Sequence, residues 1–279
     1  PSTTVERSHP QFSPDGKELA FIEDRNRLMV LNLETKKVRR ITDGSTWYST
    51  SGGFDYAWSP DSKWFTLEFI GNKHDPYSDI GLVSAQGNGE IINLTNSGYS
   101  SGSPSFALDG NAILFTTERY GMRAHASWGS LDDAMLVFLN QDAYDKFSLS
   151  KEDYELYKEA NSDRKKVAAK DSSKVKDVVV ELKNIEDRIV RLTPNSSNMG
   201  STLISKDGKA LYYLASTESG RNLWKMDLNK KETKLLHKVD AGWTSLEMDK
   251  EGKTLFILNG KNMQKMNLAS DDLKPIKYL

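Results

Sequence analysis

The chain repeats one pattern of apolar and polar positions several times, and the clearest copy lies near its start. There, Phe12 precedes a Ser-Pro-Asp-Gly turn that ends at Gly16, and apolar residues then alternate with others from Leu19 to Phe21. Serine suits the first turn position, proline presets φ at the second, and glycine tolerates the positive φ that such turns require. A period of two is the strand signature. The pattern therefore predicts two antiparallel strands joined by this turn.

The pattern occurs five times. The position of the turn glycine is occupied by Gly16, Ser62, Gly110, Gly208 and Gly252. Each copy continues with a third strand-like run, and a fourth run follows it. Four short strands per unit, at a period of about 40 to 50 residues, are typical of a β-propeller blade, which buries both faces against its neighbours. A β-sandwich is the competing fold, but it does not require the same turn to recur at a fixed period.

We therefore predict an all-β fold, a β-propeller of five four-stranded antiparallel blades that forms one domain over residues 1–279. The expected blades span about residues 5–45, 50–97, 100–195, 198–239 and 241–279. The third blade is far longer than the others, because 98 residues separate Gly110 from Gly208. This length predicts an insertion between its third strand, at residues 134–138, and its fourth strand, which ends at Thr193.

The predicted insertion covers residues 140–177 and begins with helices. Residues 140–161 have helical character, and the stretch from Ser150 to Asp153 resembles a capping box that opens a second short helix. The expected apolar face of these helices consists of Tyr144, Phe147, Leu149, Tyr154, Leu156 and Tyr157. Residues 163–177 carry few large apolar side chains, so we expect a solvated, mobile linker there.

Composition narrows the classes of function. The net charge of -1 does not favour a nucleic-acid or membrane surface, both of which ask for a basic excess. The basic cluster at residues 164–166 is interleaved with acids and not with aromatic residues, which also argues against nucleic-acid binding. No run of about 18 apolar residues is present, so we expect no membrane span. The absence of cysteine excludes disulfides, thiol nucleophiles and Cys-ligated zinc, and leaves the redox compartment open.

The sequence offers little sign of catalytic chemistry. Its four histidines are His9, His74, His125 and His237, and none lies in a zinc-binding His-Glu-x-x-His pattern. No Gly-x-Ser-x-Gly elbow occurs either. The adjacent acids Glu23-Asp24, Asp132-Asp133 and Asp271-Asp272 are poor metal sites, because neighbouring residues of a strand point to opposite faces. We therefore assign no catalytic residue, cofactor site or metal site.

The best candidate for a binding site is the segment that contains Arg119, Arg123, His125 and Trp128. It is a glycine-bounded loop in which the pattern of strand pairing lapses. One interpretation is structural: Trp128 fills a pocket and the arginines cap carbonyl groups, so that the loop anchors the insertion. The other is that these four residues dock a neighbouring domain or line a peptide path.

The repeated turn and strand resemble the blade repeat of TolB-type propellers, of the PD40 or WD40-like kind, which also occurs in prolyl oligopeptidase and tricorn-type peptidases. Three longer stretches give a sharper resemblance. They are Arg-Tyr-Gly-Met-Arg-Ala-His-Ala-Ser-Trp-Gly-Ser at 119–130, Phe-Leu-Asn-Gln-Asp-Ala-Tyr-Asp-Lys-Phe at 138–147 and Asn-Ile-Glu-Asp-Arg-Ile-Val-Arg-Leu-Thr at 184–193. They resemble the propeller of bacterial, Bacteroidetes-like, tricorn-type serine peptidases, and the resemblance covers essentially the whole chain.

The resemblance implies a non-catalytic module of a serine-type peptidase, a hydrolase that acts in proteolysis. In that family a PDZ domain and a peptidase core of the tail-specific type follow the propeller, so the implied partners are those two domains and a peptide or unfolded-protein substrate. The propeller would gate or dock that substrate. The resemblance also implies export, with the periplasm as the expected compartment.

The family's propellers have six or seven blades, so five copies indicate a fragment of a longer ring. The first residues, which lack a Met and a signal pattern, look like a cut. An open blade edge would invite association, so an oligomer is a further expectation. Two alternatives remain. One is a stand-alone protein-interaction propeller like that of TolB. The other is a propeller glycosidase or lyase, which would need a convergent acidic or histidine cluster at the mouth of the channel.

Overall fold

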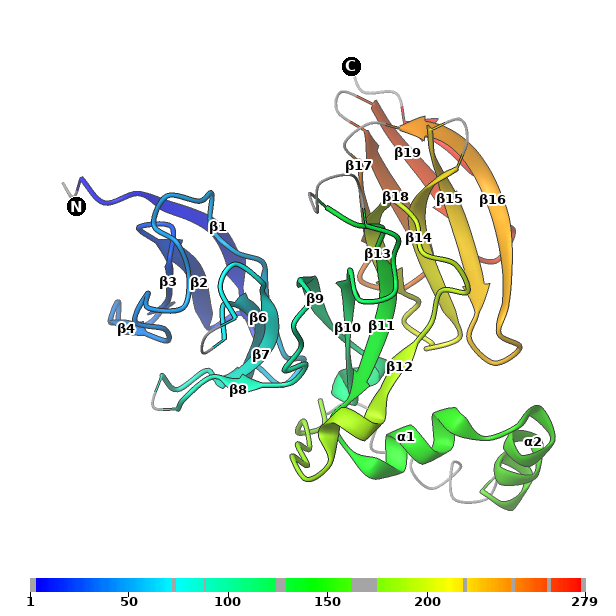
Figure 1. The fold of residues 1–279 in the computed structure, drawn as a ribbon, viewed down its shortest axis with the longest axis horizontal. Coiled ribbons are helices and arrows are strands. Elements are labelled where there is room, and N and C mark those ends of the chain that lie inside the picture. Colours follow the sequence, from blue (N-terminus) through cyan, green and yellow to red (C-terminus); the bar gives the residue numbers. More distant parts are fainter. Residues whose placement is uncertain are drawn as a thin grey trace.

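The computed structural model describes residues 4–71, 74–87, 89–123, 129–161, 175–217, 220–241, 244–259 and 262–276. It contains five separate four-stranded sheets in which every neighbouring pair of strands is antiparallel. Each sheet is a blade, and the blades follow one another around an arc (Figure 1). The predicted all-β propeller with five blades is confirmed.

The strands of the blades have the following bounds. The first blade holds β1 (Arg7–Phe12), β2 (Glu18–Glu23), β3 (Arg27–Asn32) and β4 (Val38–Arg40). The second holds β5 (Tyr56–Trp58), β6 (Trp64–Phe69), β7 (Asp79–Ser84) and β8 (Ile92–Asn93). The third holds β9 (Ser101–Ala107), β10 (Ala112–Thr117), β11 (Asp133–Phe138) and β12 (Ile189–Arg191).

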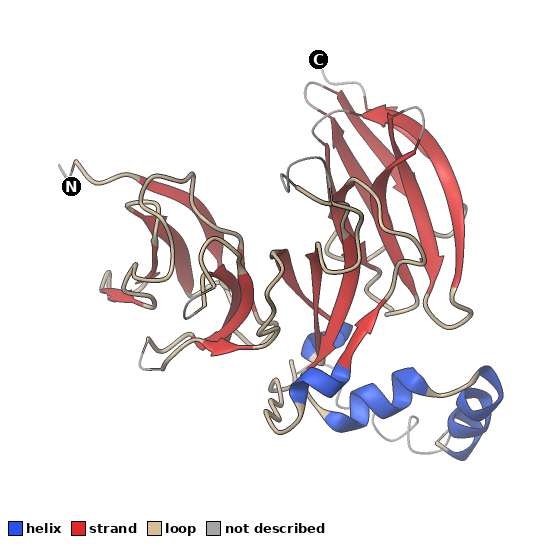
Figure 2. Ribbon diagram, viewed as in Figure 1, coloured by secondary structure: helices blue, strands red, loops and turns tan. Residues whose placement is uncertain are grey.

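The fourth blade holds β13 (Met199–Ile204), β14 (Ala210–Thr217), β15 (Gly220–Asp227) and β16 (Glu232–Ala241). The fifth holds β17 (Thr244–Met248), β18 (Thr254–Asn259), β19 (Asn262–Asn267) and β20 (Leu273–Ile276). Strands dominate the structure, and the helices gather at one end of the third blade (Figure 2). Among the described residues, no helix has both the length and the apolarity needed to cross a lipid bilayer.

The predicted turn forms in four of the five blades, whereas the third blade has a 3-10 helix, η1 (Leu108–Gly110), at this position. In the first blade, the Gly16 amide donates to the Ser13 carbonyl at 2.8 Å, and the Ser13 hydroxyl donates to the Asp15 carboxylate at 2.6 Å. Gly16 has φ of 72°, and Ser62 adopts nearly the same φ of 60° in the second blade. The second blade therefore keeps the turn although a residue with a side chain occupies the left-handed position.

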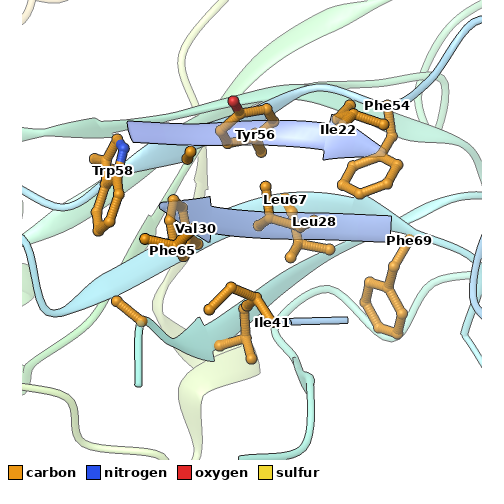
Figure 3. Close-up of a cluster of buried hydrophobic side chains, with 13 residues drawn as sticks. Ile22, Leu28, Val30, Ile41, Phe54, Tyr56, Trp58, Phe65, Leu67 and Phe69 are labelled. Atoms are coloured by element: carbon orange, nitrogen blue, oxygen red, sulfur yellow. The ribbon is translucent and has the colours of Figure 1, made fainter. Parts of the chain in front are cut away.

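Apolar side chains are buried mainly where one blade packs on the next. Four buried clusters join the first blade to the second, the second to the third, the third to the fourth, and the fourth to the fifth. Figure 3 shows the first of these, in which Leu28 and Val30 meet an aromatic group from the second blade. Within that group, the rings of Trp58 and Phe65 lie 4.0 Å apart between centroids. None of the four clusters of described residues joins the first blade to the fifth, and these two blades lie at the two ends of the arc (Figure 1).

The outer face of the first blade, which points away from the second, is correspondingly open. Pairing places Phe12, Leu19, Leu31 and Val38 in one row on this face. Phe12 is 67% exposed, although the equivalent Trp58 in the second blade is buried.

The insertion contains α1 (Gln141–Ser148) and α2 (Lys151–Ala160). Ser150 caps α2 by accepting from the Asp153 amide at 3.1 Å, and Asn140 caps α1 in the same way. The rings of Phe138 and Phe147 lie 5.0 Å apart between centroids, so α1 packs on the third blade. The expected apolar face is therefore only partly covered, because Leu156 of α2 remains exposed.

The chain returns from the insertion along the second and third blades. The Val178 amide donates to the Asp61 carboxylate at 2.8 Å, and Lys63 pairs with Asp177 at 2.6 Å. A short 3-10 helix, η4 (Ile185–Arg188), then leads into β12. The buried guanidinium of Arg188 donates to the carbonyls of Phe138, Lys183 and Glu181. Most of the predicted mobile linker, residues 162–174, lies outside the described residues.

Candidate functional site

The loop between β10 and β11, residues 118–132, contains the residues predicted as a binding site. Arg119 and Arg123 are described and exposed, whereas His125 and Trp128 lie outside the described residues. The backbone of Arg123 forms an isolated antiparallel bridge with Ser130. This bridge joins the two arms of the loop, so Arg123 has a defined backbone position within it.

Both described arginines lie against tyrosine rings. The Arg119 guanidinium carbon lies 5.7 Å from the centroid of Tyr120, and that of Arg191 lies 5.1 Å from the same ring. The Arg123 guanidinium carbon lies 5.3 Å from the centroid of Tyr99. At such distances the π-face attracts the cation. The structure therefore brings Arg119 together with Arg191, a residue that the sequence analysis did not assign to the site.

Exposed apolar surface accompanies these cations. Tyr120 is 48% exposed, and Met122 is 79% exposed. Arg119 and Arg123 form no ion pair with a carboxylate in the described part of the chain, so their charges are free to meet an anionic or carbonyl-rich partner. Arginine, tyrosine and methionine are enriched at protein interfaces.

The buried carboxylate of Asp133 holds the Arg191 side chain in place. Its Nε and Nη2 donate to Asp133 Oδ1 at 3.0 and 2.9 Å. The hydroxyls of Thr193 and Ser196 also donate to this carboxylate, each at 2.7 Å. Asp133 therefore orients the guanidinium that lies against Tyr120.

The same arrangement in the second blade shows that this carboxylate belongs to the architecture of the repeat. Asp79, at the start of β7, is fully buried and accepts from the Thr95 hydroxyl, the Ser97 amide and the Asn93 side chain. His74 Nδ1 lies 2.6 Å from Asp79 Oδ2.

A threonine contact recurs beside these carboxylates. In three blades a threonine hydroxyl accepts a hydrogen bond from a backbone amide near the start of the third strand. The pairs are Thr42 with Leu28, Thr95 with Ile80, and Thr193 with Ala134. These networks fasten the end of the fourth strand to the third.

Asp132, the neighbour of Asp133, lies in a different environment. Burial raises the pKa of Asp132 to about 6, and the charges of Glu118 and Asp133 act in the same direction. Its backbone pairs with Ser197, through bonds of 2.8 and 3.0 Å. The carboxyl group thus lies at the base of the β10–β11 loop, with a pKa raised toward but still below neutral pH.

A second carboxylate with an unusual pKa lies between the second and third blades. Glu68 of β6 accepts from the Ser103 amide at 2.7 Å and from the Asp55 amide at 3.3 Å. Burial, and then the negative charge of Asp55, raise the pKa of Glu68 to about 7. The Ser103 hydroxyl donates to Asp55 at 3.2 Å. No local sequence pattern marks this group, because its residues come from separate strands and loops of two blades.

We searched the described residues for a hydroxyl, a histidine and a carboxylate that contact one another in series, as in the triad of a serine hydrolase. His74 and Asp79 form a base with an orienting group, but no hydroxyl contacts His74 within the described residues. His9 Nδ1 lies 2.9 Å from Ser8 Oγ, and here no carboxylate contacts the ring in the described part of the chain. His237 Nε2 lies 2.7 Å from the Asp271 carbonyl oxygen. A nucleophile, a base and an orienting group are therefore never brought together among these residues.

The described residues also contain no group of three histidine, aspartate or glutamate side chains that converge on one metal position. His125 lies outside the described residues.

No family model matches the chain. Two curated relatives are named as peptidases. The chain is 26% identical over 260 residues to a putative tricorn-like protease C-terminal subunit of Sulfurisphaera tokodaii, and 27% identical over 221 residues to the uncharacterized peptidase YuxL of Bacillus subtilis. These matches cover 88% and 76% of this chain but only 27% and 30% of the relatives.

Solved structures agree with the fold. Over 98% of this chain, the crystal structure of the tricorn protease matches with a TM-score of 0.64 at 12% identity, and the match covers 26% of that chain. The resemblance to a tricorn-type propeller is confirmed. A putative TolB from Agrobacterium tumefaciens matches with a TM-score of 0.62 at 14% identity, over 98% of this chain and 81% of that one. Both tricorn-type and TolB propellers are therefore structural neighbours of this chain.

Proposed function

We propose that this chain is a non-catalytic propeller module of a tricorn-type serine peptidase, and that it docks or gates polypeptide substrates for a peptidase core elsewhere in the parent protein. The observation that carries the proposal is the β10–β11 loop, where Arg119 and Arg123 carry positive charge without carboxylate partners among the described residues. The neighbouring Tyr120 and Met122 supply exposed apolar surface. The similarity to relatives named as peptidases supports the link to proteolysis.

The chemistry of the loop suits a polypeptide. Guanidinium groups donate hydrogen bonds to carbonyl and carboxylate oxygens in a planar fork. Exposed tyrosine and methionine side chains contact apolar side chains of many shapes. Together they provide affinity with little demand on sequence, which is what a gate for varied substrates needs.

The proposal is tested in the full-length parent protein with the double variant Arg119→Ala and Arg123→Ala. The expected result is a rise in KM for an unfolded protein substrate, with kcat nearly unchanged, because the variant removes binding and not chemistry. The control is the double variant Arg25→Ala and Arg40→Ala, which removes two exposed arginines of the first blade. Equal kinetics of the loop variant and the control would argue against a role for the loop.

The absence of catalysis is tested separately. Purified residues 1–279, incubated with unfolded protein and with peptides, are expected to show no cleavage. Turnover that persists through purification would overturn the non-catalytic assignment.

The proposed partners are a PDZ domain and a serine-peptidase domain of the same parent protein, with export to the periplasm as the proposed location. The alternative is a stand-alone TolB-like interaction propeller, which the coverage of 81% of the TolB chain favours. The parent gene distinguishes the two, because a PDZ domain and a peptidase core encoded beyond Leu279 are expected only for the first. Cell fractionation with an antibody against the chain tests the location.

A further inference from the structure

The outer face of the first blade holds apolar positions that the other blades bury. Three residues after the turn position, Leu19 is only half-buried, whereas its four equivalents are fully buried. Leu31, its partner on β3, is also half-buried, and the four equivalents of Leu31 are buried. The equivalents are Phe65, Ile113, Leu211 and Leu255 for Leu19, and Val83, Val137, Met226 and Met266 for Leu31. Among the described residues, the first blade therefore has the side chains of a blade interface without a neighbour that covers them.

The uncovered part of this face is apolar and is separate from its charged part. Glu23 pairs with Arg7 at 3.0 Å and with Arg27 at 3.6 Å. The Arg7 guanidinium carbon lies 5.8 Å from the centroid of Phe21, and Phe21 is only 8% exposed. The apolar row of the face lies beyond these ion pairs, and Val38 at its outer end is 53% exposed. A contiguous apolar surface beside charged groups is typical of an interaction site.

In the other four blades, the sheet of the preceding blade covers the equivalent row. Phe65 of the second blade shares a buried cluster with Val30 of the first (Figure 3). The clusters between later blades combine Ile113 with Leu82, Leu211 with Leu136, and Leu255 with Leu214. The same pairing of sheet faces thus occurs four times in the described part of the chain. It indicates which kind of element fits the outer face of the first blade.

The fifth blade leaves the opposite kind of face open, the outer face that points away from the fourth blade. Phe256, four residues after the turn position, lies on this face and is only half-buried. Its equivalents in the first four blades, which face the next blade, are all buried, as Ala20, Thr66, Leu114 and Tyr212. Lys265, the partner of Phe256 on β19, is exposed on the same face. The two ends of the arc (Figure 1) therefore present opposite faces of one repeat, and a single further blade has a face for each.

We propose that the outer face of the first blade is covered by a further four-stranded blade of the parent protein, which packs on it as each described blade packs on the next. The same blade, or one that follows it in the ring, covers Phe256 on the fifth blade. Most of the length of both curated relatives lies outside the matched region, so proteins similar to this chain have polypeptide from which such a blade is built.

A second copy of this chain is the less suitable occupant. Its fifth blade carries the required kind of face, but it would have to associate from solution, whereas a blade of the same polypeptide is present at a high effective concentration. A head-to-tail contact between copies also leaves two open faces at the ends unless it closes into a ring. The proposal rests on the proposed function only in requiring a longer parent protein. It does not depend on peptidase activity or on the β10–β11 loop.

The test measures how fast single cysteines react with a maleimide in the full-length parent protein. Residues 1–279 contain no cysteine, so mass spectrometry of the labelled peptide reports one introduced position. Val38→Cys and Lys265→Cys place thiols on the outer faces of the first and fifth blades. Glu34→Cys, in the exposed turn between β3 and β4, is the control. Positions 38 and 265 are expected to react at least about tenfold more slowly than position 34.

The same three variants of residues 1–279 alone supply the comparison. In this shorter chain both outer faces are open, so the three thiols are expected to react within about threefold of one another. Circular dichroism melts establish that each variant folds. Protection that is present in the parent protein and absent from the shorter chain comes from the additional polypeptide.

A second pair of variants breaks the cover. In the parent protein with Val38→Cys, Phe12→Asp is expected to raise the labelling rate at position 38 roughly fivefold, because it places a carboxylate in the covered apolar row. Lys36→Asp, in the exposed turn, is expected to leave that rate unchanged. Because Phe12 is 67% exposed in the arc, its replacement is expected to leave the fold of the shorter chain intact.

Three results would overturn the proposal. The first is a rate at position 38 of the parent protein that equals the rate at position 34. The second is protection at position 38 without protection at position 265, which would assign the cover to an element other than a blade of the ring. The third is protection that disappears on dilution, which would identify a second copy as the occupant. None of these rates depends on proteolysis, so failure of this proposal and failure of the proposed function are seen separately.

Discussion

Arg191 donates two hydrogen bonds to the fully buried carboxylate of Asp133, at 3.0 and 2.9 Å, and the same guanidinium lies against the exposed Tyr120. A structural network of the third blade therefore supports the surface of the β10–β11 loop. The equivalent Asp79 of the second blade has no arginine partner among the described residues but accepts from Asn93 and contacts His74. The third blade thus places an arginine where the second blade places Asn93 and His74.

Replacing Asp133 by alanine is expected to lower the free energy of unfolding by about 3 kcal/mol, because the change leaves Arg191 and two hydroxyls without their acceptor. Urea denaturation followed by tryptophan fluorescence measures this. The control is Asp142→Ala, an exposed position in the first turn of α1. It is expected to change stability by less than about 0.5 kcal/mol. A loss below about 1 kcal/mol for Asp133→Ala would contradict the assigned role of the carboxylate.

Glu68 makes stability depend on pH. Burial raises its pKa to about 7 in the folded chain, whereas the ordinary value is 4.5. The folded state therefore binds more protons than the unfolded state between these values, so the protonated carboxyl stabilises the fold at low pH and this contribution is lost as pH rises toward 7. Glu68→Gln keeps a neutral side chain at all pH values.

From pH 5 to pH 8, the free energy of unfolding of wild type is therefore expected to fall by about 2 kcal/mol more than that of Glu68→Gln. Urea denaturation at the two pH values measures the difference. The control is Glu34→Gln, an exposed side chain in the turn between β3 and β4, which is expected to leave the pH dependence of wild type unchanged. An identical pH dependence of wild type and Glu68→Gln would show that Glu68 titrates normally.

The open outer face of the first blade predicts unequal costs for two equivalent leucines. Leu19 and Leu211 each lie three residues after the turn glycine, but Leu211 is fully buried between the third and fourth blades and Leu19 is only half-buried. Leu211→Ala is expected to lower the free energy of unfolding by about 3 kcal/mol, because it creates a cavity. Leu19→Ala is expected to lower it by less than about 1 kcal/mol. Equal losses in denaturation experiments would indicate that something covers the first blade in solution.

The repeat could be predicted from the sequence because each blade uses local signals, a tight turn and a period of two, that reach no further than a hairpin. The capping residue Ser150 was predictable for the same reason. The contact of Arg123 with Tyr99 and the position of Arg191 against Tyr120 were not, because Tyr99 precedes β9 and Arg191 lies in β12, on the far side of the insertion. Contacts between blades, such as that of Glu68 with Ser103, depend on the angle at which two sheets pack. No local sequence pattern encodes that angle.

Substitutions at the turn position of Gly16 and Ser62 isolate the energy of a left-handed backbone. Ser62 holds φ of 60° at the position where Gly16 has φ of 72°. This region costs a residue with a Cβ about 1 kcal/mol. The Ser62 hydroxyl recovers part of that cost, because it accepts weakly from the Asp15 amide at 3.3 Å. Ser62→Gly is therefore expected to stabilise the chain by only about 0.5 kcal/mol.

The reverse change, Gly16→Ser, is expected to destabilise the chain by about 1 kcal/mol. No atom within 4 Å obstructs the added Cβ, so only the backbone cost remains. Thermal and urea denaturation of the two variants measure both changes, and opposite signs are the expected result. If Gly16→Ser were neutral, the left-handed conformation would not account for the preference for glycine in this turn.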